Sequence, residues 1–163
     1  MSDESAKKKV TIIVFSGDLD RVMAAFIIAT GAASMGFEVV MFFTFWGLNV
    51  VKKNEGAIPA QGFLRKMMSR MNRGGTKRLP LSRMDMYSVG RRLMKRFMRQ
   101  SGVPTVDELM AMAKSMGVKM IACTTSMGVM GVPKEVLRPE VDTVAGVATY
   151  LGNASEGNIN LFI

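Results

Sequence analysis

One thiol is the side chain most able to do chemistry in this sequence. Cys123 is the only cysteine of the 163 residues, and it follows the short apolar run 118–122, which is typical of a buried strand. The residues expected to open a helix directly after it are Thr124, Thr125, Ser126 and Met127. A thiol between a strand end and a helix N-terminus lies where α/β sheets bind ligands, and helix amides favour a thiolate. The pattern predicts a reactive Cys123, against the alternative of a small buried apolar residue.

A helix end alone does not ionise such a thiol fully. At a reference pKa near 8.5, only about 3% of a thiol is ionised at neutral pH, whereas a depression of about two units gives roughly three quarters. The free energy needed for that depression exceeds the contribution of an exposed helix end, which is typically about 0.3–1 kcal/mol. We therefore expect a neighbouring Arg or Lys, or a hydrogen bond from Ser126, to stabilise the thiolate.

The composition excludes several classes of site. The chain has no histidine, so it holds no Ser-His-Asp triad, no Cys-His pair and no imidazole base. One cysteine without histidine provides too few ligands for zinc, and we expect neither a metal nor a cofactor. A single cysteine forms no disulfide within the chain, which fits a reducing cytoplasm.

The hydrophobic pattern predicts alternating strands and helices. Strands are expected at 10–15, 37–45, 118–122 and 158–163, and helices at 19–35, 105–116 and 144–154. Asp18 is expected to cap the first helix, and Thr105 with Glu108 is predicted to form a capping box. Buried strands that alternate with helices predict an α/β fold, a flavodoxin-like three-layer sandwich with a mostly parallel sheet.

One domain is expected from the length of the chain. Residues 1–9 are predicted to be a disordered polar leader, and residues 10–163 a single domain with a basic, methionine-rich helical insertion at 63–100. The apolar stretch 22–51 contains Glu38 as its only charge, but it divides at Gly36. A buried helix followed by a buried strand is therefore predicted there, not a membrane-spanning helix.

The positive charge of the chain is concentrated in the insertion. Residues 65–99 hold 12 of the 22 Lys and Arg but only one acid, Asp85, while the rest holds 10 bases and 12 acids. Two amphipathic helices are predicted in it, with apolar faces at Phe63, Leu64, Met67, Met68 and Met71, and at Met86, Leu93, Met94 and Phe97. These faces could complete the core or an oligomer interface, lie on an anionic membrane, or bind an acidic protein, whereas nucleic acid is not expected.

Four stretches of the sequence resemble one known family. They are CTTSMGVMG at 123–131, FSGDLD at 15–20, GAASMG through FFTFWG at 31–47, and GVATYL at 146–151. Through these residues the chain resembles the DsrE/DsrF/DsrH-like family, and specifically its DsrE2-type branch, over most of residues 10–163. The insertion rich in Met and Arg also resembles that branch.

The resemblance implies a domain that assembles into trimers or hexamers and carries sulfur as a cysteine persulfide. Cys123 would bear the persulfide, and the supporting motif around it would be Thr124, Thr125, Ser126 and Met127. Some relatives have a second cysteine, which this chain lacks, so sulfur would have to leave to another protein. The family is often labelled peroxiredoxin-like, and it includes both sulfurtransferases and non-enzymatic carriers, so both activities are open here.

We therefore expect a cytoplasmic sulfur-trafficking protein that accepts sulfur on Cys123 and passes it to the thiol of a partner protein. The alternative is a non-catalytic adaptor whose basic insertion docks on an anionic membrane surface or on an acidic protein partner. The two functions are compatible, because docking would bring Cys123 to a sulfur source at the inner membrane surface.

Overall fold

In the part of the chain that the structure describes, five parallel strands form the central sheet. The computed structural model describes residues 8–54 and 74–163. The strands are β1 (Lys9–Val14), β2 (Glu38–Phe43), β3 (Lys119–Cys123), β4 (Thr143–Ala145) and β5 (Ile159–Phe162). They lie in the order β4-β3-β2-β1-β5, and each neighbouring pair is parallel.

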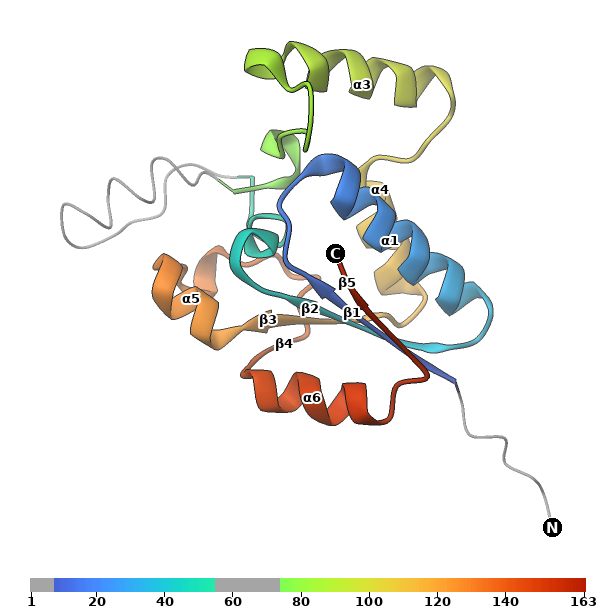
Figure 1. The fold of residues 1–163 in the computed structure, drawn as a ribbon, viewed down its shortest axis with the longest axis vertical. Coiled ribbons are helices and arrows are strands. Elements are labelled where there is room, and N and C mark those ends of the chain that lie inside the picture. The colour runs from blue at the N-terminus through green and yellow to red at the C-terminus, as the bar shows by residue number, and fades with distance from the viewer. Residues whose placement is uncertain (1–7, 55–73) are drawn as a thin grey trace.

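Helices cover the two faces of this sheet. The described α-helices are α1 (Leu19–Ser34), α3 (Val89–Gln100), α4 (Val106–Ser115), α5 (Thr124–Met130) and α6 (Val147–Ser155). The short 3-10 helices are η1 (Phe45–Asn49), η2 (Thr76–Arg78), η3 (Met86–Ser88) and η4 (Lys134–Val136). Helices α1 and α4 lie on one face of the sheet and α6 on the other (Figure 1). The predicted three-layer α/β sandwich is thereby confirmed.

Side chains of the central strands point alternately to the two faces of the sheet and so belong to two separate core clusters. In β2, Val39, Met41 and Phe43 pack into the large cluster formed with α1 and α4. Val40 and Phe42 instead belong to a small cluster with Tyr150 of α6. Successive side chains of a strand point to opposite faces. Both clusters are buried, so the central strands carry the near-continuous apolar runs that are typical of parallel sheets.

The ends of α1 and α4 agree with the sequence signals to within about one residue. Helix α1 starts after Asp18, whose side chain makes no capping hydrogen bond, and the chain turns at Gly36 with a φ of +82°. The capping box of α4 is present: Thr105 Oγ1 accepts a hydrogen bond from the Glu108 amide at 3.3 Å, and the Glu108 carboxylate accepts one from the Thr105 amide at 2.7 Å.

The prediction was wrong at the start of the last helix. Helix α6 begins at Val147 and not at Val144, because residues 143–145 form the edge strand β4, which pairs with β3. Asp142 fixes this pairing, since its carboxylate accepts a hydrogen bond from the Met120 amide at 2.8 Å and its own amide donates to the Met120 carbonyl at 2.9 Å.

The predicted leader and the first predicted amphipathic helix lie largely outside the described residues. Strand β1 already begins at Lys9, and of the insertion the second predicted helix corresponds to η3 and α3. Helix α3 lies at one end of the molecule (Figure 1); none of its residues is buried, but Met98 packs against the large cluster. None of the helices within residues 8–54 and 74–163 has the length and apolar character needed to cross a bilayer.

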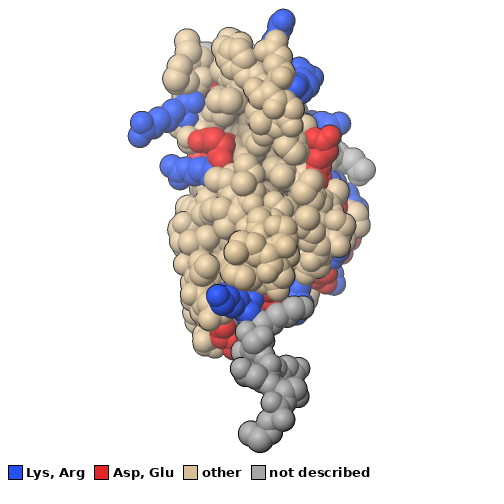
Figure 2. All heavy atoms as spheres, turned by 90° about the vertical axis from the view of Figure 1, so that its right-hand side faces the viewer, with Lys and Arg blue, Asp and Glu red and all other residues tan. Residues whose placement is uncertain are grey.

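Charge is unevenly distributed over the surface. On the face at the right of Figure 1, a broad uncharged area occupies the centre, and the Lys, Arg, Asp and Glu side chains lie mainly along its edges (Figure 2). Exposed apolar side chains include Ile27 of α1, Met35 directly after that helix and Phe162 of β5. Such surfaces are common at sites where a protein contacts another molecule.

Candidate functional site

Cys123 lies at the carboxyl end of a central strand. It is the last residue of β3 and also the N-cap of α5, as the sequence indicated. Only 4% of its surface is exposed, and it packs in the small cluster with Val40, Phe42 and Tyr150. The thiol is therefore on the α6 side of the sheet, opposite the main core.

Two hydroxyl groups meet beside this thiol. The Thr44 and Ser126 hydroxyl oxygens lie 2.6 Å apart, and either can donate the hydrogen bond between them. Thr44 directly follows β2, and the β2–β3 register pairs Phe43 with Ala122, the residue before Cys123. The parallel pairing of two neighbouring strands thus brings Thr44 to the thiol.

The surroundings of Cys123 favour its ionised form. Burial, the largest single influence, raises the pKa of the thiol. The amide and hydroxyl of Ser126, the Thr44 hydroxyl and the Thr125 amide act in the opposite direction, and together they leave the pKa below its ordinary value. Hydrogen bonds to the charged form stabilise a thiolate in the same way as they stabilise a carboxylate.

The predicted supporting residues differ in what they do. Ser126 is buried, and its amide and hydroxyl both lower the pKa of the thiol, as the Thr125 amide does. Thr124 is exposed beside the thiol. Met127 is buried in the large cluster, on the other side of the sheet from the neighbours of Cys123. Its position indicates a packing role for Met127, which anchors α5 to the core.

Thr44 was missed because no local signal marks it. It belongs to the stretch 42–47 that carried part of the family resemblance, but nothing in that stretch links a hydroxyl to residue 123. Only the register of two parallel strands makes this link. A prediction of strand order would have been needed to find it.

The segment after β2 is held in place by a close backbone approach. The Gly47 amide donates hydrogen bonds to the Phe15 carbonyl at 2.8 Å and to the Thr44 carbonyl at 2.9 Å. A β-carbon at Gly47 would lie 2.0 Å from the Val14 carbonyl oxygen, so only glycine fits. Phe45 adopts a φ of +44°, an uncommon value for a residue other than glycine. This tight turn sets the position of Thr44 next to the thiol.

The arrangement can support thiolate chemistry without a bound metal. A thiolate is the nucleophile in exchange with disulfides and persulfides, and its ionised fraction controls the rate. In the part of the chain that the structure describes, no three His, Cys, Asp or Glu side chains gather in a way that could hold a metal ion.

Comparison with known sequences gives consistent matches over almost the whole chain. The family model described as the DsrE/DsrF/DrsH-like family matches residues 6–162. The uncharacterized protein YrkE of Bacillus subtilis is 44% identical over 156 residues, which cover 96% of this chain and 97% of that protein. The sulfur carrier protein DsrE2 of Allochromatium vinosum is 34% identical over 160 residues, with 96% and 99% covered.

Comparison with solved structures supports the same fold. The ychN protein of E. coli superposes with a TM-score of 0.58 at 8% identity, covering 96% of this chain and 99% of its own. Protein MTH1491 of Methanobacterium thermoautotrophicum gives a TM-score of 0.55 at 12% identity, with 96% and 100% covered. At these identities the similarity concerns the fold alone.

Proposed function

This chain belongs to the DsrE/DsrF/DrsH-like family, and on that basis we propose that it carries sulfur as a persulfide on Cys123 and passes it to a partner thiol. The observation that carries the proposal is the position of the thiol at the start of α5, beside the Ser126 and Thr44 hydroxyls, which lower its pKa in spite of its burial. A thiol that served only as an apolar core residue would gain nothing from donors directed at its charged form.

The proposed reaction is two exchanges of one sulfur atom. In the first, the Cys123 thiolate attacks the outer sulfur of a donor persulfide; a new S–S bond forms, the donor S–S bond breaks, and the donor leaves as a thiolate. In the second, an acceptor thiolate attacks the outer sulfur on Cys123, which returns to its own thiolate form. Each step conserves charge and needs no external oxidant or reductant.

The residues beside the thiol have separate roles in this proposal. Ser126 and Thr44 stabilise the thiolate before attack and again when it leaves in the second step. Thr124 and Thr125 are exposed, so the thiol lies directly beneath the surface at this end of the sheet. Because the chain has one cysteine, the acceptor must be another molecule. The site is compatible with a true sulfurtransferase and with a passive carrier.

Mass spectrometry tests the proposal directly. After incubation with polysulfide and removal of excess reagent, the wild-type protein should gain about 32 Da, the mass of one sulfur atom, on the peptide that contains Cys123. The Cys123→Ser variant should gain nothing. The adduct should disappear when a small thiol such as dithiothreitol is added. An adduct of the same mass on Cys123→Ser would refute the proposed site.

We also propose that the protein assembles with copies of itself and acts in the cytoplasm. Val147 and Leu151 of α6 and Ile159 and Phe162 of the edge strand β5 are 44–68% exposed, which provides an apolar surface for association. Its single thiol fits a reducing compartment. Sedimentation velocity would identify the assembly, and a purely monomeric protein at micromolar concentration would contradict it.

A second function, docking as an adaptor, is favoured by the exposed faces of α3. Val89, Leu93, Met94 and Phe97 are 42–62% exposed on one side of this helix. They line a groove of about 500 Å³ between α3 and residues 81–86. The exposed basic residues on the other side are Arg92, Arg96 and Arg99. This combination would suit an anionic membrane surface or an acidic protein.

Flotation with vesicles that contain anionic lipid tests this second function. Leu93→Gln with Phe97→Gln should reduce the bound fraction, and so should Arg92→Gln with Arg96→Gln. Met112→Gln, which changes an exposed apolar residue of α4, is the control. A bound fraction that changes neither with these substitutions nor with added salt would refute electrostatic binding through α3.

A further inference from the structure

A cavity lies on the side of the sheet opposite to Cys123. It has a volume of about 200 Å³ and is enclosed by η2, the second half of α3 and the first residues of α1 and α4. Its apolar walls are Leu19, Met98, Val103 and Val106. Leu19 and Val106 belong to the large core cluster, whereas Cys123 packs in the small one on the α6 side. The cavity is therefore separate from the thiol site.

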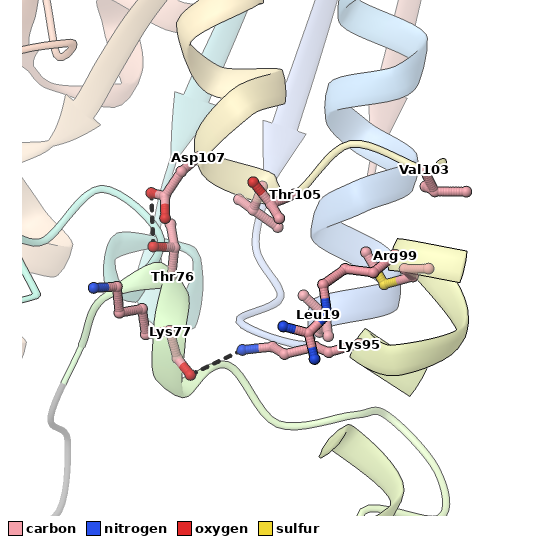
Figure 3. A pocket seen from close by; sticks show the side chains of 10 residues that line it. Leu19, Thr76, Lys77, Lys95, Arg99, Val103, Thr105 and Asp107 are labelled. Atoms are coloured by element: carbon pink, nitrogen blue, oxygen red, sulfur yellow. Dashed lines mark hydrogen bonds between the residues drawn. The ribbon is translucent and has the colours of Figure 1, made fainter. Parts of the chain in front are cut away.

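Two cations of α3 extend over this cavity. Figure 3 shows the side chains of Lys95 and Arg99 side by side in front of Leu19, while the Lys77 ammonium points away from them. The Lys95 ammonium donates a hydrogen bond to the Lys77 carbonyl at 3.0 Å, which fixes its position at the opening. One apolar wall and two adjacent cations thus surround the same space.

Within the described residues, no carboxylate forms an ion pair with the two cations at this opening. Among residues 8–54 and 74–163, no carboxylate lies within 4.0 Å of the charged group of Lys95 or Arg99. Asp107 also lines the cavity, but its carboxylate accepts hydrogen bonds from Arg138 at 2.5 Å and from Thr76 at 2.8 Å. Its charge is therefore already paired with the Arg138 guanidinium.

The spacing of the cations destabilises α3. Arg91, Lys95 and Arg99 follow one another at intervals of four residues, so their charges are neighbours on one helix face. Desolvation lowers the pKa of Lys95, and the charges of Arg91 and Arg99 lower it further, against the opposite effect of Asp107. A bound anion would relieve this repulsion.

We propose that this cavity binds a small organic anion, with its acidic group between Lys95 and Arg99 and a short apolar chain against Leu19, Met98 and Val106. An ammonium and a guanidinium bind carboxylate, sulfonate and phosphate oxygens through charge-assisted hydrogen bonds. The volume equals roughly seven water molecules, which leaves room for an acidic group and a chain of a few carbons. This inference does not depend on sulfur transfer at Cys123.

Isothermal titration calorimetry of the full-length protein tests the site with hexane-1-sulfonate as the probe. Sodium sulfate supplies the charged group alone, and hexan-1-ol supplies the apolar chain alone. Hexane-1-sulfonate should bind saturably and at least tenfold more tightly than either. Absence of saturable binding, or equal binding of hexan-1-ol, would overturn the proposal.

Substitutions on one helix separate this site from general attraction to a basic surface. Lys95→Gln and Arg99→Gln should each weaken binding of the probe about five- to tenfold. Arg92→Gln and Arg96→Gln change the net charge equally, but neither residue lines the cavity, so the effect should be less than twofold. Equal losses in the two pairs of variants would refute a specific site.

Methyl NMR gives a readout that does not rely on the variants. With methyl-labelled methionine, the probe should shift the resonance of Met98, which lines the cavity. The resonance of Met112, which is exposed on α4 outside the cavity, should stay in place. A shift of Met112 equal to that of Met98, or an unshifted Met98, would contradict binding in the cavity.

Discussion

Thr44 and Ser126 are 82 positions apart in the sequence, yet their hydroxyl oxygens lie 2.6 Å apart beside the thiol of Cys123. The contact connects the end of β2 with the first turn of α5. Since the hydroxyls of both residues lower the pKa of the thiol, the reactivity of Cys123 depends on the packing of two segments that are distant in sequence.

Replacement of Ser126 by alanine should make the thiol less reactive. The change removes a hydroxyl that favours the thiolate, so the pKa of Cys123 should rise and the ionised fraction at neutral pH should fall. We expect the rate of alkylation by iodoacetamide at about pH 7 to drop roughly three- to tenfold. The pH profile of the rate should move to higher pH. Ser34→Ala, which removes an exposed hydroxyl at the end of α1, should leave the rate unchanged.

Replacement of Gly47 by alanine should disrupt the turn that positions Thr44. The added β-carbon would meet the Val14 carbonyl oxygen at 2.0 Å, which backbone movement alone can relieve. The free energy of unfolding, measured with urea, should fall by about 2–4 kcal/mol. Gly31→Ala in α1 is the matched control, because nothing lies within 4 Å of its added β-carbon. That substitution should be neutral or stabilising by up to about 1 kcal/mol, and equal losses in the two variants would contradict the steric argument.

The sequence revealed most of the fold because its strong local signals coincide with its longest elements. The apolar runs of β1, β2 and β3 and the capping box of α4 are all local features, and each was found to within one or two residues. Strand β4 was missed because three half-exposed residues at a sheet edge carry no periodic signal. Its pairing depends on Asp142, whose partner Met120 lies in another strand.

At the candidate site too, the sequence predicted the residues that are close together along the chain and missed the one that the fold brings in from a distant segment. Cys123, Ser126 and Thr125 are close in sequence, so the strand-to-helix pattern could bring them together in advance. The register of β2 and β3 places Thr44 at the site. Met127 does not lie at the site, because its side chain packs in the large cluster. Neither fact follows from spacing along the chain.

Removal of the capping box should destabilise the domain by a predictable amount. Thr105→Ala deletes the hydroxyl that accepts a hydrogen bond from the Glu108 amide at the start of α4. We expect a loss of about 1 kcal/mol in the free energy of unfolding, within a usual range of about 0.5–2 kcal/mol. Urea denaturation followed by circular dichroism measures the change. Thr149→Ala, at an exposed position within α6, should change stability by less than about 0.5 kcal/mol, and a Thr105 variant as stable as this control would count against the cap.

Lys52 should make the stability of the protein depend on pH in the alkaline range. It is only 2% exposed, and burial lowers its pKa from 10.5 to about 8. Between these two values the unfolded chain binds the proton more strongly than the folded chain does. The contribution of Lys52 to the free energy of unfolding therefore rises with pH across this window, and it is lowest below about pH 8.

The comparison of wild type with Lys52→Met isolates this effect from other titrating groups. The free energy of unfolding of the variant minus that of wild type should fall by about 1–2 kcal/mol between roughly pH 7.5 and 9.5. Urea denaturation at both pH values gives the two differences. Lys53→Met, at the adjacent exposed position, is the matched substitution with which the change is compared. A difference for Lys52→Met that does not change with pH would mean that the folded protein holds this ammonium charged throughout the range, against the effect of its burial.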